Sequence, residues 1–356
     1  MDSRERVLTA FARSQPDRVP IGFAGVNEKI KERLTDYFKL NPDDMEGLLR
    51  NLGVDFRGVF PVYNGIRLHK EVPGRQVDPE YGIRTRWVEH HDGGYWDYCD
   101  FPLRDADEQR VAEWPMPSPD NYDYDIVVEN CKRHSPHAVY LGGAGLACIM
   151  NTAGFFRGME QVFVDLATDD PAGLLLIDRF MSIQYEVTRR ALEKAYGMID
   201  FLWMGEDLGS QNSPLIGTHI FKKHIKPRHK KFIELAKSCN LPVMMHTCGS
   251  SSWAYEDYIE MGVNVMDTLQ PEAKDMSPSY LKKRFGDRLA FHGCISTAGP
   301  LAYGTEQDVI DNLRSTLEIM MPGGGYCMAP THSIQDNTPV ENVITLYHAA
   351  RRYGRY

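Results

Sequence analysis

The sequence contains no apolar run long enough to cross a membrane and no long basic run. A membrane helix needs about 20 consecutive apolar residues, and nucleic-acid binding needs clustered Lys and Arg. The formal net charge is -9, so we expect neither a membrane protein nor a nucleic-acid partner. The opening stretch, MDSRERVLTAFARSQPDR, also lacks the apolar core and cleavage site of a signal peptide. We therefore expect it to form the first helix of a cytoplasmic protein.

Closely spaced CxxC pairs are missing as well, which argues against a purely structural zinc site. The seven cysteines are an odd number in a chain of 356 residues. Without a signal peptide, that count argues against a disulfide framework. We expect most of the cysteines to be reduced, buried and chemically inert. A cysteine that stands next to a histidine at ligand spacing needs a different explanation.

Apolar runs of strand length alternate with helical patterns along most of the chain. Runs such as PVMMH and VNVMDTL are almost continuously apolar, which is typical of parallel strands that are buried on both faces. The pattern predicts a single domain over residues 1–356, folded as a (β/α)8 barrel of the TIM type, with an open doubly wound sheet as the alternative. The eight predicted strands are Val19–Ala24, Phe56–Val62, Ala138–Gly143, Phe201–Glu206, Pro242–Thr247, Val263–Leu269, Leu289–Ile295 and Gly325–Ala329. The predicted helices include Thr218–Ser238, Ser251–Met261, Ser277–Phe285, Glu306–Met320 with Thr305 as its N-cap, and Pro339–Tyr353.

Residues 64–125 break this alternation because they are rich in aromatic and charged residues. The segment HDGGYWDY has two alternating halves around Asp92-Gly93-Gly94, which predicts a β-hairpin. A proline-rich stretch, WPMPSPDNYDYD, follows and is typical of a loop. We interpret residues 64–125 as an insertion after the second strand and not as a separate domain.

The sharpest chemical feature is His246-Thr247-Cys248-Gly249, at the end of the fifth predicted strand. Residues two apart on a strand point to the same side, and barrel active sites lie at the C-terminal ends of the strands. An imidazole and a thiolate form a zinc-like pair, although a packed histidine with an inert cysteine would leave the same pattern. Cys327, in the eighth predicted strand, could aim a third ligand into the barrel mouth. Three ligands with an open fourth position are typical of a catalytic zinc.

Two carboxylates, Glu206 and Asp207, end the neighbouring fourth strand. Glu206 is our candidate for a fourth zinc ligand, and either carboxylate could hold a ligand histidine in the correct tautomer. A carboxylate at this position could equally cap a helix or order a loop. Cys294, which follows His292 in a second H-x-C, competes with Cys327 as the third ligand.

Several segments in order resemble the uroporphyrinogen decarboxylase superfamily, and the resemblance covers nearly the whole chain. They are the opening RERVLTAFARSQPDRVPIGF, the central MGEDLGSQNSPLIGTHIFKKHIKPRHKKFIELAK and the C-terminal GGGYCMAPTHSIQDNTPVENV. The decarboxylases carry an N-terminal arginine motif that grips the porphyrinogen carboxylates. This chain has IGFAGVNEKIKE there, without matching arginines, and no obvious arginine cluster elsewhere. Porphyrinogen decarboxylation is therefore disfavoured.

The H-x-C and the distant cysteine in a glycine-rich last strand instead resemble the zinc signature of the superfamily's methyltransferases. These include methylcobalamin:coenzyme M methyltransferases and the enzymes that demethylate methoxylated compounds in anaerobes. The resemblance implies His246, Cys248 and Cys327 as zinc ligands, whereas Cys294 falls outside the motif.

From this resemblance we expect a zinc-dependent methyltransferase that works with a corrinoid-binding partner protein and a small-molecule methyl donor. The partner would supply the cobalamin, because this chain has no D-x-H-x-x-G cobalamin-binding motif. The aromatic residues Tyr95, Trp96 and Tyr98 favour an aromatic, methoxylated donor, although they could simply pack the hairpin. We assign Glu206, Asp207 and His332 to catalysis, and Asn151, Gln211 and His332 to substrate binding.

Three alternatives remain open at this point. The direction of transfer could be reversed, from methylcobalamin to a thiol that zinc activates. The chain could be a metal-free lyase of the decarboxylase type, with Asp207 and His332 in its pocket. It could also be a binding protein in which zinc only orders the loops.

Overall fold

The computed structural model describes residues 1–91 and 93–356, and a seven-stranded parallel sheet forms its centre. Each strand lies beside the next main strand of the chain, in the order β1-β7-β8-β9-β10-β11-β12. In a doubly wound sheet the order in which the strands are added reverses partway across the sheet. No such reversal occurs among these strands, so that alternative is wrong. The strands are β1 (Phe56–Val59), β7 (Ala138–Gly142), β8 (Phe201–Gly205), β9 (Val243–Thr247), β10 (Val265–Thr268), β11 (Ala290–Ile295) and β12 (Tyr326–Pro330).

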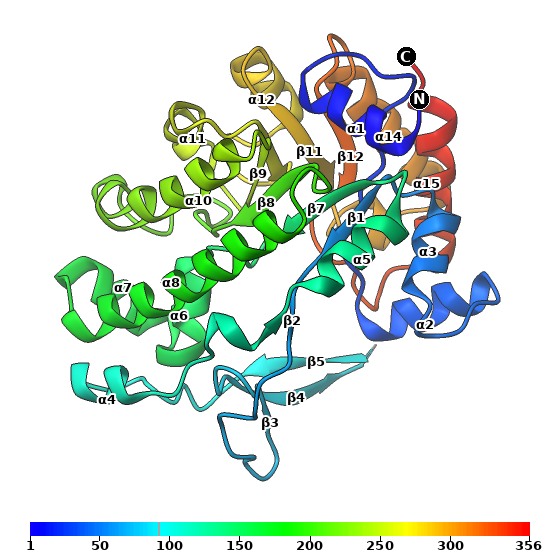
Figure 1. The fold of residues 1–356 in the computed structure, drawn as a ribbon. Coiled ribbons are helices and arrows are strands. Elements are labelled where there is room, and N and C mark those ends of the chain that lie inside the picture. The colour runs from blue at the N-terminus through cyan, green and yellow to red at the C-terminus, as the bar shows by residue number, and fades with distance from the viewer. Residues whose placement is uncertain (92) are drawn as a thin grey trace.

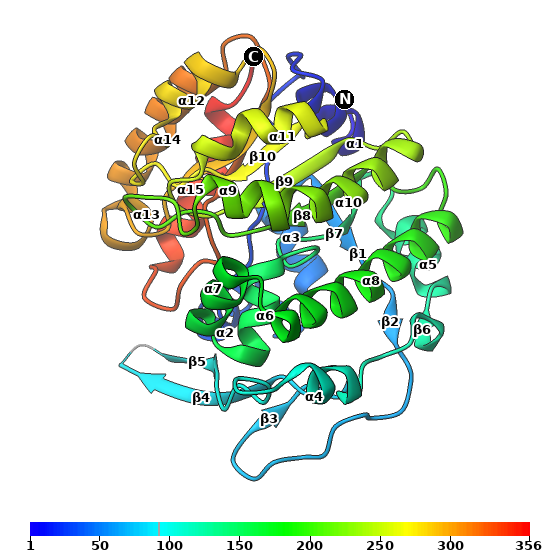
Figure 2. The same cartoon turned by 90° about the vertical axis from the view of Figure 1, so that its left-hand side faces the viewer.

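An extended segment, Pro20–Gly22, lies between the two edge strands of this sheet. On one side, the Gly22 amide donates to the carbonyl of Met328 in β12 at 2.7 Å, and the Met328 amide donates to the carbonyl of Pro20 at 2.9 Å. On the other side, the amide of Asp55, just before β1, donates to the carbonyl of Ile21 at 2.8 Å. The segment therefore joins β12 to β1, and the curled sheet and its outer helices give a TIM-barrel-like α/β fold (Figures 1 and 2).

Helices cover the outside of the sheet (Figure 1). The long α8 packs against α10 and the much shorter α4, and α14 and α15 pack together near the C-terminus. The helices are α1 (Ser3–Phe11), α2 (Glu28–Tyr37), α3 (Met45–Leu52), α4 (Glu108–Glu113), α5 (Asp125–His134), α6 (Ile149–Arg157), α7 (Met159–Thr168), α8 (Pro171–Lys194), α9 (Thr218–Ile220), α10 (Lys226–Ser238), α11 (Tyr255–Met261), α12 (Pro278–Phe285), α13 (Pro300–Tyr303), α14 (Glu306–Met320) and α15 (Val340–Tyr353), with short turns of other helix types at Pro119–Asn121, Phe221–Ile225 and Ser252–Ala254. Among the residues described, no helix is long and apolar enough to span a bilayer.

Helix α1 covers the end of the barrel at which the strands begin. Its Arg4 forms an ion pair of 2.6 Å with Asp200, directly before β8, and its Arg6 bonds to Asp55, directly before β1, at 2.8 Å. Phe11 places its ring 4.9 Å from that of Phe201 in the barrel interior. The opposite end, where the strands finish, is therefore the mouth at which TIM-type barrels carry their active sites.

A three-stranded antiparallel sheet lies on the mouth side of the molecule, well away from α1 (Figure 1). Its long strands, β4 (Arg84–His90) and β5 (Gly93–Tyr98), form what we call the ribbon, and β3 (Gln76–Val77) pairs along β4. The ribbon touches the rest of the protein near both ends. The Tyr98 ring stacks on Phe155 of α6 with centroids 3.7 Å apart, and Gly93 lies so close to Asp336, in the loop after β12, that a Cβ there would come within 2.3 Å of its carboxylate.

The predicted elements agree with the structure except at a few places. Seven of the eight predicted strands form the parallel sheet, but Val19–Ala24 forms a single isolated bridge, between Ile21 and Met328. The predicted helix over Glu306–Met320 has the expected bounds, and Thr305 caps it. The described part of residues 64–125 contributes no strand to the parallel sheet. Besides the ribbon and β3 it holds β6 (Tyr122–Asp123), which pairs with β2 (Val62–Tyr63) just before this stretch. The predicted hairpin turn includes Asp92, which lies outside the described residues.

The carboxylate of Asp55 holds in place the Pro20–Gly22 segment that joins β12 to β1. It is fully buried and accepts hydrogen bonds from the Ile21 amide at 2.7 Å, from Arg6 at 2.8 Å and from Arg18 at 2.8 and 3.0 Å. Removal of one partner from a buried ion pair leaves the other charge without compensation, at a cost of about 3–5 kcal/mol.

We therefore expect Asp55→Ala to lower the free energy of unfolding by ~3–5 kcal/mol, measured by urea denaturation. Asp125→Ala is the matched control, because Asp125 is 74% exposed and its ion pair is with the exposed Lys194; it should change stability little. Equal stability of the two variants would show that Asp55 does not secure the barrel closure.

Candidate metal centre

His246 and Cys248 meet at the mouth end of β9. His246 is the fourth residue of β9 and Cys248 follows its last residue. The Cys248 Sγ lies 3.4 Å from the His246 Nε2, so the pair shares one side of the strand as the spacing predicted. Both residues are partly exposed. Two ligand-type atoms therefore face the same accessible space.

Asp207, two residues after the end of the adjacent strand β8, completes a group of three. One ligand atom each from Asp207, His246 and Cys248 lies within 4.8 Å of the others, and the Asp207 Oδ1 is 3.7 Å from the His246 Nε2. The Cys248 amide donates to that same oxygen at 3.2 Å, and the Asn151 side chain donates to the Asp207 Oδ2 at 2.8 Å. Two donors thus fix the carboxylate so that it faces the histidine and the cysteine.

Asp267, near the end of β10, orients the histidine. Its Oδ2 accepts from the His246 Nδ1 at 2.8 Å, while its Oδ1 lies 2.6 Å from the Nδ1 of His292 in β11. β9, β10 and β11 are neighbours, with His246, Asp267 and His292 in register. A carboxylate that binds one imidazole nitrogen directs the other nitrogen towards a metal. We did not predict this role from the sequence, although a charged residue within the apolar run VNVMDTL is a signal for it.

The charges of the group depend on burial and on these contacts. Burial opposes protonation of His246, but its bonds to Asp267 and Cys248 outweigh burial and raise its pKa well above the ordinary value. Burial raises the pKa of the Cys248 thiol, with His246 acting in the opposite direction. Burial also acts to raise the pKa of Asp207, yet His246 and the Asn151 bond hold that pKa below its usual range. A cation bound by this group would have to replace any proton held at the His246 Nε2 and at the Cys248 thiol.

The backbone is strained beside this group. Thr268 has a φ of +83°, which is unfavourable for a β-branched residue. Its Oγ1 lies 2.6 Å from the His246 Nδ1, so the unusual conformation accompanies a contact with the metal-type histidine. Strain of this kind, of the order of 1–3 kcal/mol, persists where the surrounding structure enforces it and clusters at functional sites.

The structure does not bring Glu206 or Cys327 into this group. Glu206 is fully buried, and its carboxylate accepts hydrogen bonds from the amides of Ile149 and Met150 at 2.7 and 3.1 Å, at the start of α6. This is the helix-capping role that we had considered as the alternative. Cys327 is fully buried in β12, level in register with His292 and nearer the start of the strand than its mouth end. Burial raises the pKa of its thiol well above normal, which favours the neutral form.

The other predicted site residues lie at different places around the mouth. Asn151 supports Asp207, as its hydrogen bond shows. Gln211 is exposed in the loop after β8, where its carbonyl accepts from the Lys274 amide. His332 is exposed, two residues beyond the end of β12. Cys294 is buried in β11, and burial raises the pKa of its thiol strongly.

The donor set fits a zinc-type cation. It combines one imidazole, one thiolate and one carboxylate, all of which zinc accepts. The histidine is oriented by a second carboxylate, as metal-binding histidines usually are. Exposed fractions of 15% for His246 and 29% for Asp207 leave the group open on one side. A catalytic zinc needs such an open position, whereas a structural zinc is closed.

We expect the protein purified without chelator to contain about one zinc per chain, and Cys248→Ala to abolish binding, as measured by elemental analysis.

Two matched pairs test the ligand set. Asp207→Asn should lower the zinc content whereas Glu206→Gln should not, because Glu206 is engaged with backbone amides. Cys327→Ala should retain zinc if the ligands are Asp207, His246 and Cys248. Cys294→Ala serves as its control. Loss of zinc in Cys327→Ala alone would restore the ligand set inferred from the family resemblance.

Comparisons with known proteins agree with this fold. A methyltransferase from Methanosarcina mazei superposes with a TM-score of 0.65 over 99% of both chains, at 18% sequence identity, which supports the fold alone. Two methylcobamide:CoM methyltransferases MtaA, from Methanosarcina barkeri (strain Fusaro / DSM 804) and Methanosarcina barkeri, are 29% and 28% identical over 139 residues. That match spans 39% of this chain and 38% of each relative.

The family comparison covers more of the chain. The family model for uroporphyrinogen decarboxylase (URO-D) matches residues 116–353. This stretch includes β7 to β12, the Asp207–His246–Cys248 group and α15. The chain therefore belongs to the uroporphyrinogen decarboxylase (URO-D) family.

Proposed function

We propose that this protein is a zinc-dependent methyltransferase that moves a methyl group from a methoxylated, aromatic substrate to the Co(I) corrinoid of a separate corrinoid-binding protein. The observation that carries the proposal is the Asp207–His246–Cys248 group, held open at the mouth of a URO-D-family barrel. The two relatives named as methylcobamide:CoM methyltransferases support the class of chemistry. A metal-free decarboxylase would not need a thiol and an oriented imidazole facing the same space.

Each residue of the site has a task in this proposal. Asp207, His246 and Cys248 would hold the zinc, and the bound zinc would supply a Lewis acid for the ether oxygen of the donor. Asp267 keeps the His246 Nε2 directed at the group, and Asn151 keeps Asp207 turned towards it. The position that these ligands leave open is where the donor oxygen would bind. His332 and Gln211, exposed after β12 and β8, are candidate contacts for the rest of the substrate.

The methyl transfer itself is a nucleophilic displacement. The bond between the methyl carbon and the ether oxygen breaks, and its electron pair stays on the oxygen. A Co(I) corrinoid on the partner would supply the electron pair of the new bond to carbon, and the oxygen would take up a proton from solvent to leave as a phenol. An aryl oxide is a poor leaving group, so the reaction needs both charge stabilisation at the oxygen and a very strong nucleophile. This chain has no cobalamin-binding motif, so the nucleophile must come from a partner.

An aromatic surface beside the group supports an aromatic donor. Trp96 and Tyr98 share one face of the ribbon, and Trp87 lies directly opposite Trp96 across the strands. This face turns towards α6, because Tyr98 stacks on Phe155. One turn earlier on α6, Asn151 bonds to Asp207. The three ribbon side chains, which include the Tyr98 ring that stacks on Phe155, are still 41–50% exposed, so they offer aromatic surface to a planar ligand.

A thiol methyltransferase is the second candidate, and it is favoured by the two MtaA relatives, which are named as methylcobamide:CoM methyltransferases. In that reaction the same open position would hold a thiolate, and methylcobalamin would be the donor. The ligand group is compatible with both directions because zinc accepts oxygen and sulfur ligands. The two candidates differ in whether an ether or a thiol gives turnover.

A coupled assay distinguishes them. The zinc-loaded protein is mixed with a Co(I) corrinoid protein and methoxylated benzoates, and methylation of the cobalt is followed by absorbance. We expect turnover that Cys248→Ala abolishes, because the variant loses a metal ligand. Demethylation without any corrinoid would contradict the partner requirement. Turnover only in the reverse arm, with methylcobalamin and coenzyme M, would establish the thiol reaction instead.

The ribbon face makes its own prediction. Trp96→Ala should lower kcat/KM for the aromatic donor by about 2- to 10-fold, since an aromatic contact contributes ~0.5–1.5 kcal/mol. Tyr196→Ala is the matched control, because Tyr196 is 69% exposed and lies just after α8, before β8 begins. An unchanged kcat/KM in Trp96→Ala would remove the ribbon from the substrate site.

A further inference from the structure

A cavity of about 810 Å³, separate from the Asp207–His246–Cys248 group, lies between the ribbon and α4. Its lining contains four arginines from separate parts of the chain and two aspartates, Asp100 and Asp105. The arginines are Arg84 and Arg86 of β4, Arg104 after β5, and Arg110 of α4. None of these residues belongs to the Asp207–His246–Cys248 group. The sequence showed no arginine cluster, because folding brings together residues that are up to 26 positions apart.

Most of this positive charge is not neutralised by the protein. Asp100 is occupied by Arg75, whose guanidinium donates to it at 3.0 and 3.2 Å, and Arg84 lies 3.8 Å away. Within the described part of the chain, no carboxylate forms an ion pair with Arg86, Arg104 or Arg110. The protein carries a formal net charge of -9, so a basic cavity stands out against its overall charge.

Two of the arginines are held in place by aromatic rings. The Arg104 guanidinium lies 4.8 Å from the centre of the Phe101 ring, and the Arg110 guanidinium lies 5.4 Å from that of Trp114. A guanidinium over a ring has its face covered, while the N–H groups along its edge stay free to donate. The lining of this cavity therefore offers oriented donors that no carboxylate among the described residues accepts from.

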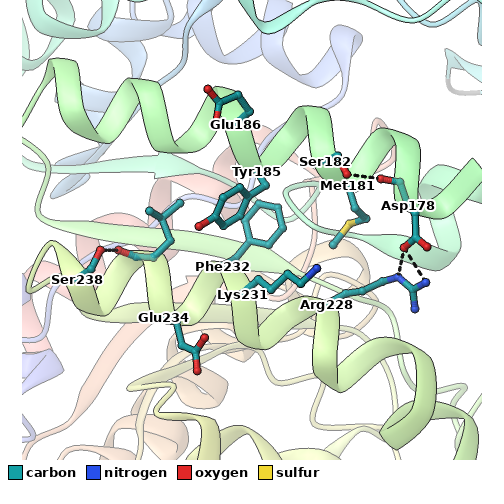
Figure 3. Close-up of a pocket in the computed structure, with 11 residues that line it drawn as sticks. Asp178, Met181, Ser182, Tyr185, Glu186, Arg228, Lys231, Phe232, Glu234 and Ser238 are labelled. Carbon is teal, nitrogen blue, oxygen red and sulfur yellow. Dashed lines mark hydrogen bonds and ion pairs between the residues drawn. The ribbon is translucent and has the colours of Figure 1, made fainter.

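A groove elsewhere on the surface shows the contrast. The groove between α8 and α10, of about 550 Å³, is also lined by charged residues (Figure 3). There, Arg228 donates to Asp178 at 2.8 Å, and Glu186 is bound by Arg189 and Arg190. Those charges satisfy one another, so that groove has much less need of an ionic ligand.

We propose that the cavity lined by Arg84, Arg86, Arg104 and Arg110 binds a small molecule that carries a multiply charged oxyanion, either a phosphate or a group of carboxylates. The planar fork of arginine matches both kinds of oxyanion. Tyr98 lines this cavity and also belongs to the aromatic face of the ribbon, so the bound anion would sit beside the barrel mouth. The proposal depends on the charges of the cavity alone and holds whether or not the protein is a methyltransferase.

Isothermal titration of the zinc-loaded protein at low ionic strength tests the proposal, with inorganic phosphate and propane-1,2,3-tricarboxylate as the two probes. We expect at least one probe to bind, and binding to weaken as salt is added. The double variant Arg104→Gln/Arg110→Gln should bind about tenfold more weakly or worse. Arg228→Gln, in the groove of Figure 3, is the matched control and should bind like the unaltered protein.

Each outcome has a definite meaning. Binding of phosphate alone identifies a phosphate ligand, binding of the tricarboxylate alone identifies a carboxylate ligand, and binding of both supports the shared oxyanion chemistry. Binding of neither probe overturns the proposal. It is also overturned if Arg228→Gln weakens binding as much as the double variant, or if the double variant binds normally while its melting temperature shows that it is folded.

Discussion

The carboxylate of Asp267 joins two histidines from neighbouring strands, and the geometry of the site depends on this interaction. One oxygen holds His246 and the other holds His292, so the imidazole at the mouth and the imidazole inside the barrel are fixed by the same group. His292 in turn needs space that only a glycine leaves, because a Cβ at Gly22 would come within 2.0 Å of its Nε2. The segment that joins the two edge strands must therefore have a glycine next to His292, which shares Asp267 with the metal-type histidine His246.

The two ends of the barrel carry different kinds of interaction. At the end where the strands begin, Asp55 and Asp200 are bound by arginines of the N-terminal region and satisfy buried charge. At the mouth, Asp207, His246 and Cys248 leave ligand atoms facing an accessible space. Charges at the first end stabilise the fold, whereas charges at the mouth are available to a cation and a substrate. This division is the general one in TIM-type barrels, where loops at the strand ends can vary without loss of the core.

In the proposed function, the ribbon would add a second layer of recognition to the mouth. One face presents Trp87, Trp96 and Tyr98 towards α6, and the cavity beside it collects arginines from β4, the following loop and α4. An aromatic surface and an oxyanion cavity that share Tyr98 suit a ligand, or two adjacent ligands, with planar and anionic parts. Such an arrangement would let the ribbon select the substrate while the barrel holds the reactive group.

The sequence by itself determined the elements whose causes are local. Apolar runs located seven strands of the sheet, and capping by Thr305 located a helix with the right bounds. The spacing of His246 and Cys248 predicted that they share a side, because alternation along one strand needs no knowledge of the fold. Only the tertiary structure decided which residues from other strands join them. It brings Asp207 and Asp267 to His246, turns Glu206 to the start of α6 and leaves Cys327 within the barrel. It also gathers the four arginines that line the cavity beside the ribbon. Those contacts depend on strand register and on where loops return to the mouth, and residue order within a single segment does not contain either.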